Sequence, residues 1–175
     1  MCQDYSSNIR IQCSLGPRNN TVTIATMKYY IVLLLLATLS SPALAELSLA
    51  EKGRAFLEKN QQVEGVAITK SGLQYKILEP GNSKRPTNRS QVTINYQGKH
   101  VDNSVFDSTF NDEPSVLSLR KAIKGWKEGL QFIGEGGRIV LFVPSRLAYG
   151  RDGAPPIIKR NETLIFIIDL LEVHD

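Results

Sequence analysis

Apolar and polar residues alternate in several short stretches over the C-terminal two thirds of the chain. This alternation, or the dense apolar character of a buried strand, is found in Leu73–Ile77, Val92–Tyr96, Val116–Leu119, Arg138–Val143 and Leu164–Val173. Turn residues separate these stretches, and the gaps are too short for the helices that connect parallel strands. The pattern therefore predicts five strands in a mainly antiparallel sheet.

Two segments have helical spacing instead. Ser48 and Glu51 fit a capping box, and the apolar residues that follow predict a helix from Leu49 to about Gln61. This helix is interpreted as a packing helix, with an N-terminal arm or a dimer contact as the alternative. A second, short helix is predicted inside the sheet region, where apolar residues recur at Ile123, Trp126, Leu130 and Ile133 before Gly134. The fold class is therefore α+β.

The segment before the first helix resembles a targeting signal. Met27-Lys28 precedes the apolar run Ile31–Leu39, and Ala43-Leu44-Ala45 supplies small residues before a polar one. A basic start, a short apolar core and small-x-small are typical of a secretory signal peptide over residues 27–45. A signal anchor is the alternative. We expect residues 1–26 to be an over-extended start and the mature protein, from residue 46, to be exported to the periplasm or secreted without stable membrane insertion.

Composition limits the remaining chemistry. The 175 residues are 42% apolar and 22% charged, which is typical of one soluble globular domain. The net charge of +4 is scattered, so no nucleic-acid partner is expected. Both cysteines, Cys2 and Cys13, precede the expected cleavage site, and the two histidines are His100, in an expected loop, and the penultimate His174. We therefore expect no metal and no cofactor.

Five aromatic residues are the remaining candidates for a site: Tyr96, Phe106, Trp126, Tyr149 and Phe166. The ordinary interpretation of each is a core residue. Tyr149, however, lies between Ala148 and Gly150 in an expected loop, where a large ring needs something to cover. Asp107 follows Phe106 directly, and a carboxylate beside an apolar pocket needs a hydrogen-bond partner, for which Tyr96 is a candidate.

Three segments together resemble the FKBP-type peptidyl-prolyl cis-trans isomerases. The first is Val92-x-Ile94-x-Tyr96-x-Gly98 followed by Phe106-Asp107-Ser108, the second is Ala122–Leu130, and the third is Pro144-x-x-Leu147-Ala148-Tyr149-Gly150 followed by Thr163–Phe166. The stretch Thr69–Tyr75 is similar to the exported bacterial branch, which includes the macrophage infectivity potentiator proteins. The long helical dimerisation region of those proteins has only a short helix in its place here.

The resemblance implies a five-stranded antiparallel half-barrel wrapped around one short helix over residues 69–175, preceded by a helix and linker over residues 46–68. It also implies a pocket between sheet and helix. In that pocket Trp126 would form the floor, and Tyr96, Phe106 and Phe166 the walls. Ile123 would add a wall and a backbone N–H, Tyr149 a hydroxyl, and Asp107 part of the rim. Ala122 and Ile158 would be further lining residues.

The function implied by the resemblance is cis-trans isomerisation of X–Pro bonds in proline-containing polypeptides that are unfolded or folding, with macrolides such as rapamycin as inhibitors. A proline-binding chaperone or interaction module without turnover is the alternative, and Ser115 and Ala154, which depart from larger residues common in the family, favour it. A purely structural domain is the third interpretation, but it leaves Tyr149 without a role.

Overall fold

The computed structural model describes residues 48–174, which belong to one compact unit. The expected signal peptide and the preceding segment lie outside the described residues. The helices are α2 (Leu49–Asn60) and α3 (Lys124–Gly129), with 3-10 turns at Leu119–Lys121, Leu130–Phe132 and Ser145–Leu147. The strands are β1 (Ala67–Ile68), β2 (Gln74–Glu79), β3 (Gln91–His100), β4 (Val105–Ser108), β5 (Ser115–Ser118), β6 (Gly137–Val143) and β7 (Leu164–His174).

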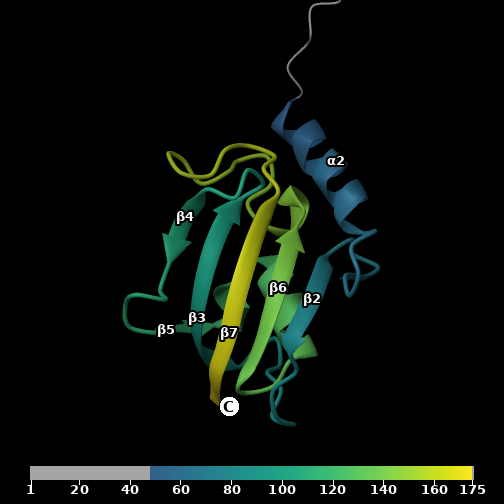
Figure 1. Ribbon diagram of the computed structural model, residues 1–175. Coiled ribbons are helices and arrows are strands. Elements are labelled where there is room, and N and C mark those ends of the chain that lie inside the picture. Colours follow the sequence, from purple (N-terminus) through teal and green to yellow (C-terminus); the bar gives the residue numbers. More distant parts are fainter. Residues whose placement is uncertain (1–47, 175) are drawn as a thin grey trace, which may run out of the picture. The chain divides into compact units, whose positions relative to one another are not determined.

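The strands form one antiparallel sheet in the order β1-β2-β6-β7-β3-β4, with β5 also paired to β3. The long strands β3 and β7 lie in its middle, and the helical segments of the internal region lie behind it in Figure 1. Since α3 is covered by a curved antiparallel sheet, the predicted α+β fold class is confirmed.

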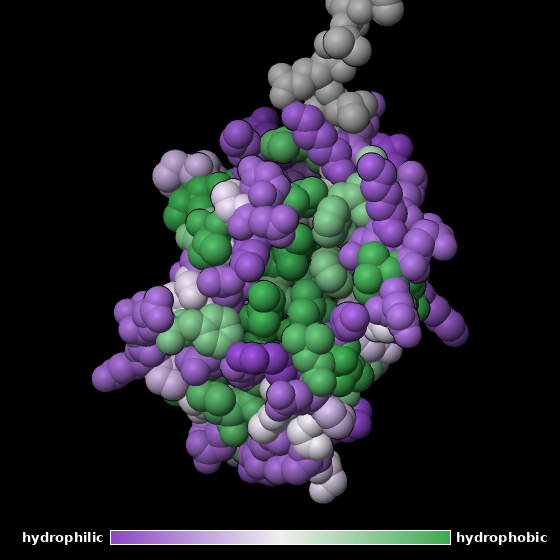
Figure 2. All heavy atoms as spheres, in the orientation of Figure 1, coloured by the Kyte–Doolittle hydropathy of each residue, from purple (hydrophilic) through white to green (hydrophobic). Residues whose placement is uncertain are grey.

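Burial alternates along the strands as the sequence pattern predicts. In β6, Ile139, Leu141 and Val143 are buried toward α3, while the residues between them are half-buried on the outer face. Figure 2 shows this outer face, where apolar side chains gather over the middle of the sheet and polar ones surround them. Residues two apart thus share a face and adjacent residues lie on opposite faces, which fixes the register of each strand.

Glycine lets α3 approach the sheet. A Cβ at Gly125 would lie 2.6 Å from Cγ1 of Val143, and one at Gly129 would lie 2.5 Å from Cδ2 of Leu141. Real Cβ atoms do not pack this closely, so any larger residue would push the helix outward. The two glycines therefore hold Trp126, which lies between them, close against the sheet.

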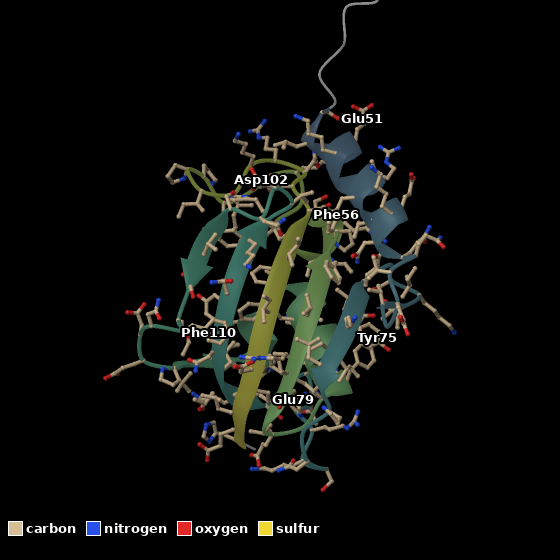
Figure 3. The ribbon with its side chains drawn as sticks, in the orientation of Figure 1. Glu51, Phe56, Tyr75, Glu79, Asp102 and Phe110 are labelled. Carbon is tan, nitrogen blue, oxygen red and sulfur yellow. The ribbon has the colours of Figure 1, made fainter. Side chains whose placement is uncertain are left out.

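Helix α2 is capped as predicted and packs on the same domain. The Ser48 side chain accepts from the N–H of Glu51, whose carboxylate accepts from the Ser48 N–H in return. Figure 3 shows Glu51 near the N-terminal end of α2 and Phe56 on the side toward the sheet, where its ring centroid lies 5.9 Å from that of Phe142. At its C-terminal end, the Asn60 amide donates to Gln74 Oε1 at 2.8 Å.

Three details of the prediction were wrong. The sheet has two more strands, β1 and β4, because these short segments rely on pairing with β2 and β3 rather than on their own pattern. His100 is the last residue of β3 and not part of a loop. The predicted helix over Ile123–Ile133 is shorter, since α3 ends at Gly129 and tightens into a 3-10 turn.

The described residues contain no helix long and apolar enough to cross a membrane.

Candidate functional site

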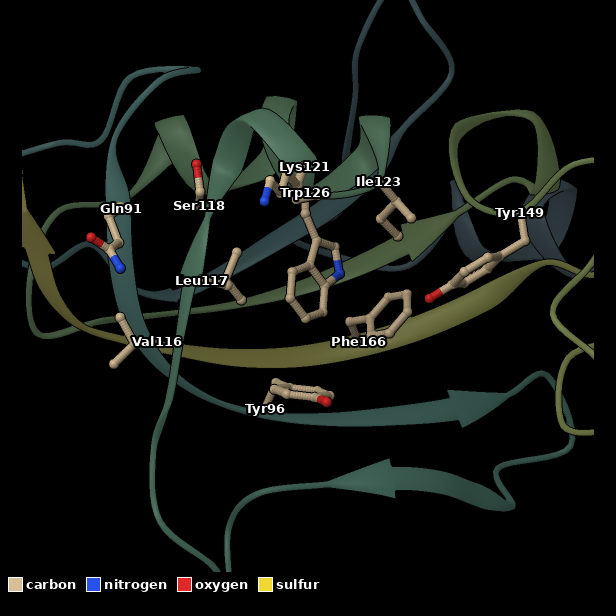
Figure 4. Close-up of a pocket in the computed structure, with 11 residues that line it drawn as sticks. Gln91, Tyr96, Val116, Leu117, Ser118, Lys121, Ile123, Trp126, Tyr149 and Phe166 are labelled. Atoms are coloured by element: carbon tan, nitrogen blue, oxygen red, sulfur yellow. The ribbon is translucent and has the colours of Figure 1, made fainter.

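The two 3-10 turns Leu119–Lys121 and Leu130–Phe132, together with α3 between them, are called the helical segment. A cavity of about 650 Å³ lies between this segment and the inner face of the sheet. Two long strands supply Tyr96 from β3 and Phe166 from β7, and α3 supplies Trp126. Figure 4 shows these three rings grouped at its centre. The remaining lining residues are Gln91, Val116, Leu117, Ser118, Lys121, Ala122, Ile123 and Tyr149.

The aromatic rings pack edge to face. The ring centroids of Tyr96 and Trp126 are 5.1 Å apart at 70°, and those of Trp126 and Phe166 are 5.1 Å apart at 88°. Phe106 extends the cluster, with its centroid 5.9 Å from that of Phe166. Such pairs contribute about 0.5–1.5 kcal/mol each beyond the area that they bury, so the walls are held in place before any ligand binds.

A glycine makes room for Phe106. A Cβ at Gly98 of β3 would lie 2.5 Å from Cζ of the Phe106 ring, and β4 pairs Asp107 with Gly98. The ring thus lies across the backbone of β3, where a side chain would otherwise stand. This close approach explains the combination of Gly98 and Phe106 that the sequence shows.

The Tyr96 hydroxyl donates a hydrogen bond of 2.5 Å to Oδ2 of Asp107, as the sequence predicted. Burial, this hydrogen bond and the negative charge of Asp107 raise the pKa of Tyr96 far above the usual 10. Burial and the charge of Asp107 also raise the pKa of Tyr149. Both phenols therefore stay protonated at neutral and moderately alkaline pH, and both remain hydrogen-bond donors.

Three donors at the cavity are without a partner among the described residues. Nε1 of Trp126 is buried and unbonded. The backbone N–H of Ile123, just before α3, makes no hydrogen bond within residues 48–174. The Tyr149 side chain is 39% exposed, and in Figure 4 its hydroxyl points toward Phe166. The site thus combines apolar walls with donors and is suited to an apolar group next to a carbonyl.

A part-buried hydrogen bond between His100 and Glu162 supports the wall from behind. Nδ1 of His100 lies 2.7 Å from Oε1 of Glu162, and the His100 ring lies 5.0 Å from that of Phe106. The other carboxylate oxygen of Glu162 accepts from the N–H of Lys159 at 2.7 Å. Glu162 therefore connects the end of β3 with the loop that precedes β7.

The structure brings most of the predicted residues together. Six of them line the cavity: Tyr96, Ala122, Ile123, Trp126, Tyr149 and Phe166. Phe106 and Asp107 lie next to these, through the contacts given above. Ile158 is 5% exposed and belongs to the core, and its backbone pairs with that of Ala154. Neither Ser115 nor Ala154 lines the cavity; Ser115 pairs with Ile94 in the sheet.

Five lining residues were missed by the sequence interpretation: Gln91, Val116, Leu117, Ser118 and Lys121. They extend the cavity along β5 and away from Tyr149. The alternation of Val116–Leu119 predicted a strand but not which side chains face a cavity. No cluster of three His, Cys, Asp or Glu side chains that could hold a metal ion occurs within residues 48–174.

Comparison with known proteins gives a consistent result. The family model described as FKBP-type peptidyl-prolyl cis-trans isomerase matches residues 82–171, and one for the domain amino-terminal to it matches residues 42–77. The peptidyl-prolyl cis-trans isomerase Mip of Coxiella burnetii is 43% identical over 125 residues, which are 71% of this chain and 54% of that protein. The outer membrane protein MIP of Legionella longbeachae is 42% identical over 70% of this chain and 53% of its own length.

Solved structures show the same likeness. The crystal structure of FkpA from Escherichia coli has a TM-score of 0.68 at 39% identity and covers 70% of this chain and 58% of that one. A peptidyl-prolyl cis-trans isomerase from Pseudomonas syringae has the same TM-score of 0.68 at 29% identity, over 73% of this chain and 94% of that one. The chain spans about half the length of the curated relatives it matches. From the family model, these identities and the shared fold, the chain belongs to the FKBP-type peptidyl-prolyl cis-trans isomerase family.

Proposed function

We propose that this protein accelerates the cis-trans isomerisation of X–Pro bonds in unfolded or folding polypeptides. The observation that carries the proposal is the cavity itself, in which edge-to-face aromatic walls surround unbonded N–H and O–H donors. A proline ring is an apolar group directly bonded to an amide, so such a cavity matches both parts of the substrate.

The chemistry requires no bond to be made or cut. The planar amide is held by conjugation, and rotation has a barrier of about 18–20 kcal/mol. The two X–Pro isomers differ by only about 0.5–1 kcal/mol, so the barrier alone limits the rate. A catalyst therefore has to bind the twisted amide more tightly than either planar form, and each 1.4 kcal/mol of difference gives about a tenfold faster rotation.

Twisting ends the conjugation and leaves the carbonyl oxygen less charged than in the planar amide. A cavity that excludes water favours this less polar state. In the proposal, Trp126 contacts the proline ring from below, and Tyr96, Phe106 and Phe166 enclose it. The N–H of Ile123 holds a substrate carbonyl, and the Tyr149 hydroxyl donates from the opposite loop. Asp107 positions Tyr96 through their hydrogen bond.

Ala122 is proposed to contact substrate at the cavity edge, and Ile158 to support the loop after Tyr149 from within the core. A macrolide such as rapamycin is proposed to occupy the same cavity. Residues 69–175 are proposed to be the isomerase domain and residues 46–68 a helix and linker. We also propose export to the periplasm or secretion, and export is supported by the signal-like sequence of residues 27–45 and by the name of the Legionella relative, an outer membrane protein.

The test is a protease-free isomerisation assay on a short X–Pro peptide with the purified full-length chain, with and without rapamycin. We expect acceleration that rapamycin abolishes. Trp126→Leu and Phe106→Leu should each lower kcat/KM by about tenfold or more, since each removes a cavity wall. Phe110→Leu is the matched control, because that ring lies against Arg138, a contact apart from the cavity.

A folded sample without acceleration would refute the isomerase proposal and favour a proline-binding module. Turnover that survives both wall variants would show that the cavity is not the site. The thermal unfolding temperature of each variant shows whether it is folded. A Phe106→Leu chain that is folded but inactive has lost the site and kept the fold.

A further inference from the structure

A second depression, of about 510 Å³, lies on the outer side of the helical segment that forms the cavity floor. Four of the seven residues that line it are basic, namely Arg89, Arg120, Lys124 and Lys127. The others are Asn88, Glu128 and Gln131. We call this hollow, with its four cationic side chains, the basic depression. It was not apparent in the sequence, where its members are spread over 39 positions among ordinary charged residues.

The four cations are not used within the domain. Their side chains make no hydrogen bond or ion pair with another residue in the part of the chain that the structure describes. The acidic lining residue, Glu128, already accepts a hydrogen bond of 2.7 Å from Ser71 Oγ, and Gln131 donates to Asn88 at 2.8 Å. Ser71 is neutral and leaves the charge of Glu128 in place, so the lining carries four positive charges against one negative. The excess positive charges repel one another, and an external anion would relieve that repulsion.

The basic depression adjoins the aromatic cavity through consecutive residues. Lys121 lines the cavity and Arg120 lines the depression, both within the 3-10 turn Leu119–Lys121. Helix α3 likewise places Trp126 in the cavity floor and Lys124 and Lys127 in the depression. Figure 4 shows Lys121 beside Trp126, with Ser118 and Gln91 farther from Tyr149. A bound chain that leaves the cavity past Lys121 therefore comes next to Arg120 of the depression.

We propose that the basic depression binds acidic segments of the client polypeptide that flank the proline held in the aromatic cavity. The inference rests on the proposed isomerase function and names its preferred substrates, which are unfolded chains with Asp or Glu near an X–Pro bond. An extended chain advances about 3.3 Å per residue, so carboxylates two to six residues from the proline reach about 7–20 Å along this path.

The expected effect is moderate and depends on salt. An exposed ion pair changes affinity by about 1.4- to fivefold, so two independent pairs multiply to roughly two- to 25-fold, and we take a value near fivefold. The Debye length falls from about 10 Å at 0.1 M salt to about 3 Å at 1 M, which removes most of this attraction. Preference for acidic clients at low ionic strength, and its loss at high ionic strength, is therefore the signature.

The experiment uses the full-length chain and two fluorescent X–Pro peptides. One peptide has three Glu residues on each side of the proline region, and the other has three Gln residues at the same positions. Isomerisation gives kcat/KM, and fluorescence anisotropy gives the affinity for each peptide. We expect about a fivefold preference for the Glu peptide in both measurements at about 0.05 M salt, and almost none at about 1 M.

Lys124→Glu/Lys127→Glu should abolish or reverse this preference and leave turnover of the Gln peptide within about twofold of the starting chain. Lys59→Glu/Lys70→Glu changes the net charge equally at two exposed residues away from the depression, and it should retain the preference. Arg89→Gln/Arg120→Gln is a second, milder pair that should also reduce it, in case the first pair does not fold.

The outcomes separate this inference from the proposed function. Turnover of both peptides without a Glu preference overturns the inference alone. No turnover of either peptide overturns the isomerase proposal, and the anisotropy preference then decides the inference by itself. Equal loss of preference in the Lys59/Lys70 control shows a general charge effect and overturns it. Binding to phosphatidylglycerol vesicles that depends on Lys124 and Lys127, without a peptide preference, also overturns it in favour of a membrane surface.

Discussion

Removal of the Glu162 carboxylate tests how the cavity wall and its loop are held. Glu162 is 9% exposed and accepts two hydrogen bonds of 2.7 Å, one from His100 and one from the backbone of Lys159. Glu162→Ala leaves both donors without an acceptor and opens space for water beside them. His100 is 62 residues away in sequence, so its contact with Glu162 exists only in the folded chain, whereas Lys159 is three residues away.

The magnitude follows from the two lost bonds. A buried donor without an acceptor costs about 1–3 kcal/mol. Both donors lie near the surface, where water replaces part of the loss, so the total should be near the lower limit for two groups, about 2 kcal/mol. For a domain of this size we expect the melting temperature to fall by about 8 °C. KM should rise about threefold, because His100 no longer fixes the ring of Phe106.

Glu162→Gln is the matched variant, since its amide oxygen can still accept from Lys159 and its amide nitrogen can donate to a neutral His100. It should cost about half as much as the alanine substitution. Urea unfolding measures the free energies, and the isomerisation assay measures kcat and KM separately. A free energy of unfolding for Glu162→Ala within about 0.5 kcal/mol of that of the parent chain would contradict this role of Glu162. Equal destabilisation by the Gln and Ala substitutions would contradict it as well.

Three further predictions concern packing and pH. Gly125→Ala should cost about 1–3 kcal/mol in urea unfolding, and Gly125→Ala/Val143→Ala should cost less than the sum of its single changes, because the second change removes the clashing methyl groups. Hydrogen bonds, first from Lys84, lower the pKa of Glu135 to about 2 from 4.5. This carboxylate therefore stabilises the fold above pH 4.5 and loses that effect as the pH falls toward 2, so Glu135→Gln should flatten the acid limb of a stability-versus-pH curve. Because the pKa of Tyr96 is raised above 10, kcat/KM should stay constant from pH 7 to 10; a decline in that range would show that the phenol ionises.

Much of the fold follows from local pattern. Alternation gave the positions of β2, β3, β5, β6 and β7, and the capping box placed the start of α2 at Leu49. Among the aromatic candidates, Tyr149 was singled out because a large ring in a loop needs something to cover, and the resemblance assigned the other four to a pocket. The prediction of a hydrogen bond between Asp107 and Tyr96 succeeded because a carboxylate beside apolar rings requires a donor, and few donors lie within reach.

Other parts of the site depend on contacts between distant segments. β4 has four residues and forms because β3 offers a partner strand, so its own sequence was too short to indicate it. Ile158 was expected to line the cavity, but it is not among the lining residues; it is 5% exposed, and its backbone pairs with that of Ala154. Chain order alone does not state the direction in which a loop residue points.

The periodicity of the elements and the cap of α2 could be predicted from the sequence, because both depend on residues that are neighbours along the chain and on short-range sterics and burial. The set of rings could also be predicted, through the resemblance of three separate segments to a known family. Which side chains meet across the sheet and the helical segment became clear from the folded structure alone. The contact of Glu162 with His100, the extension of the cavity to Lys121, and the basic depression all join residues whose distance depends on strand register and helix packing, because those alone set where distant backbone segments lie.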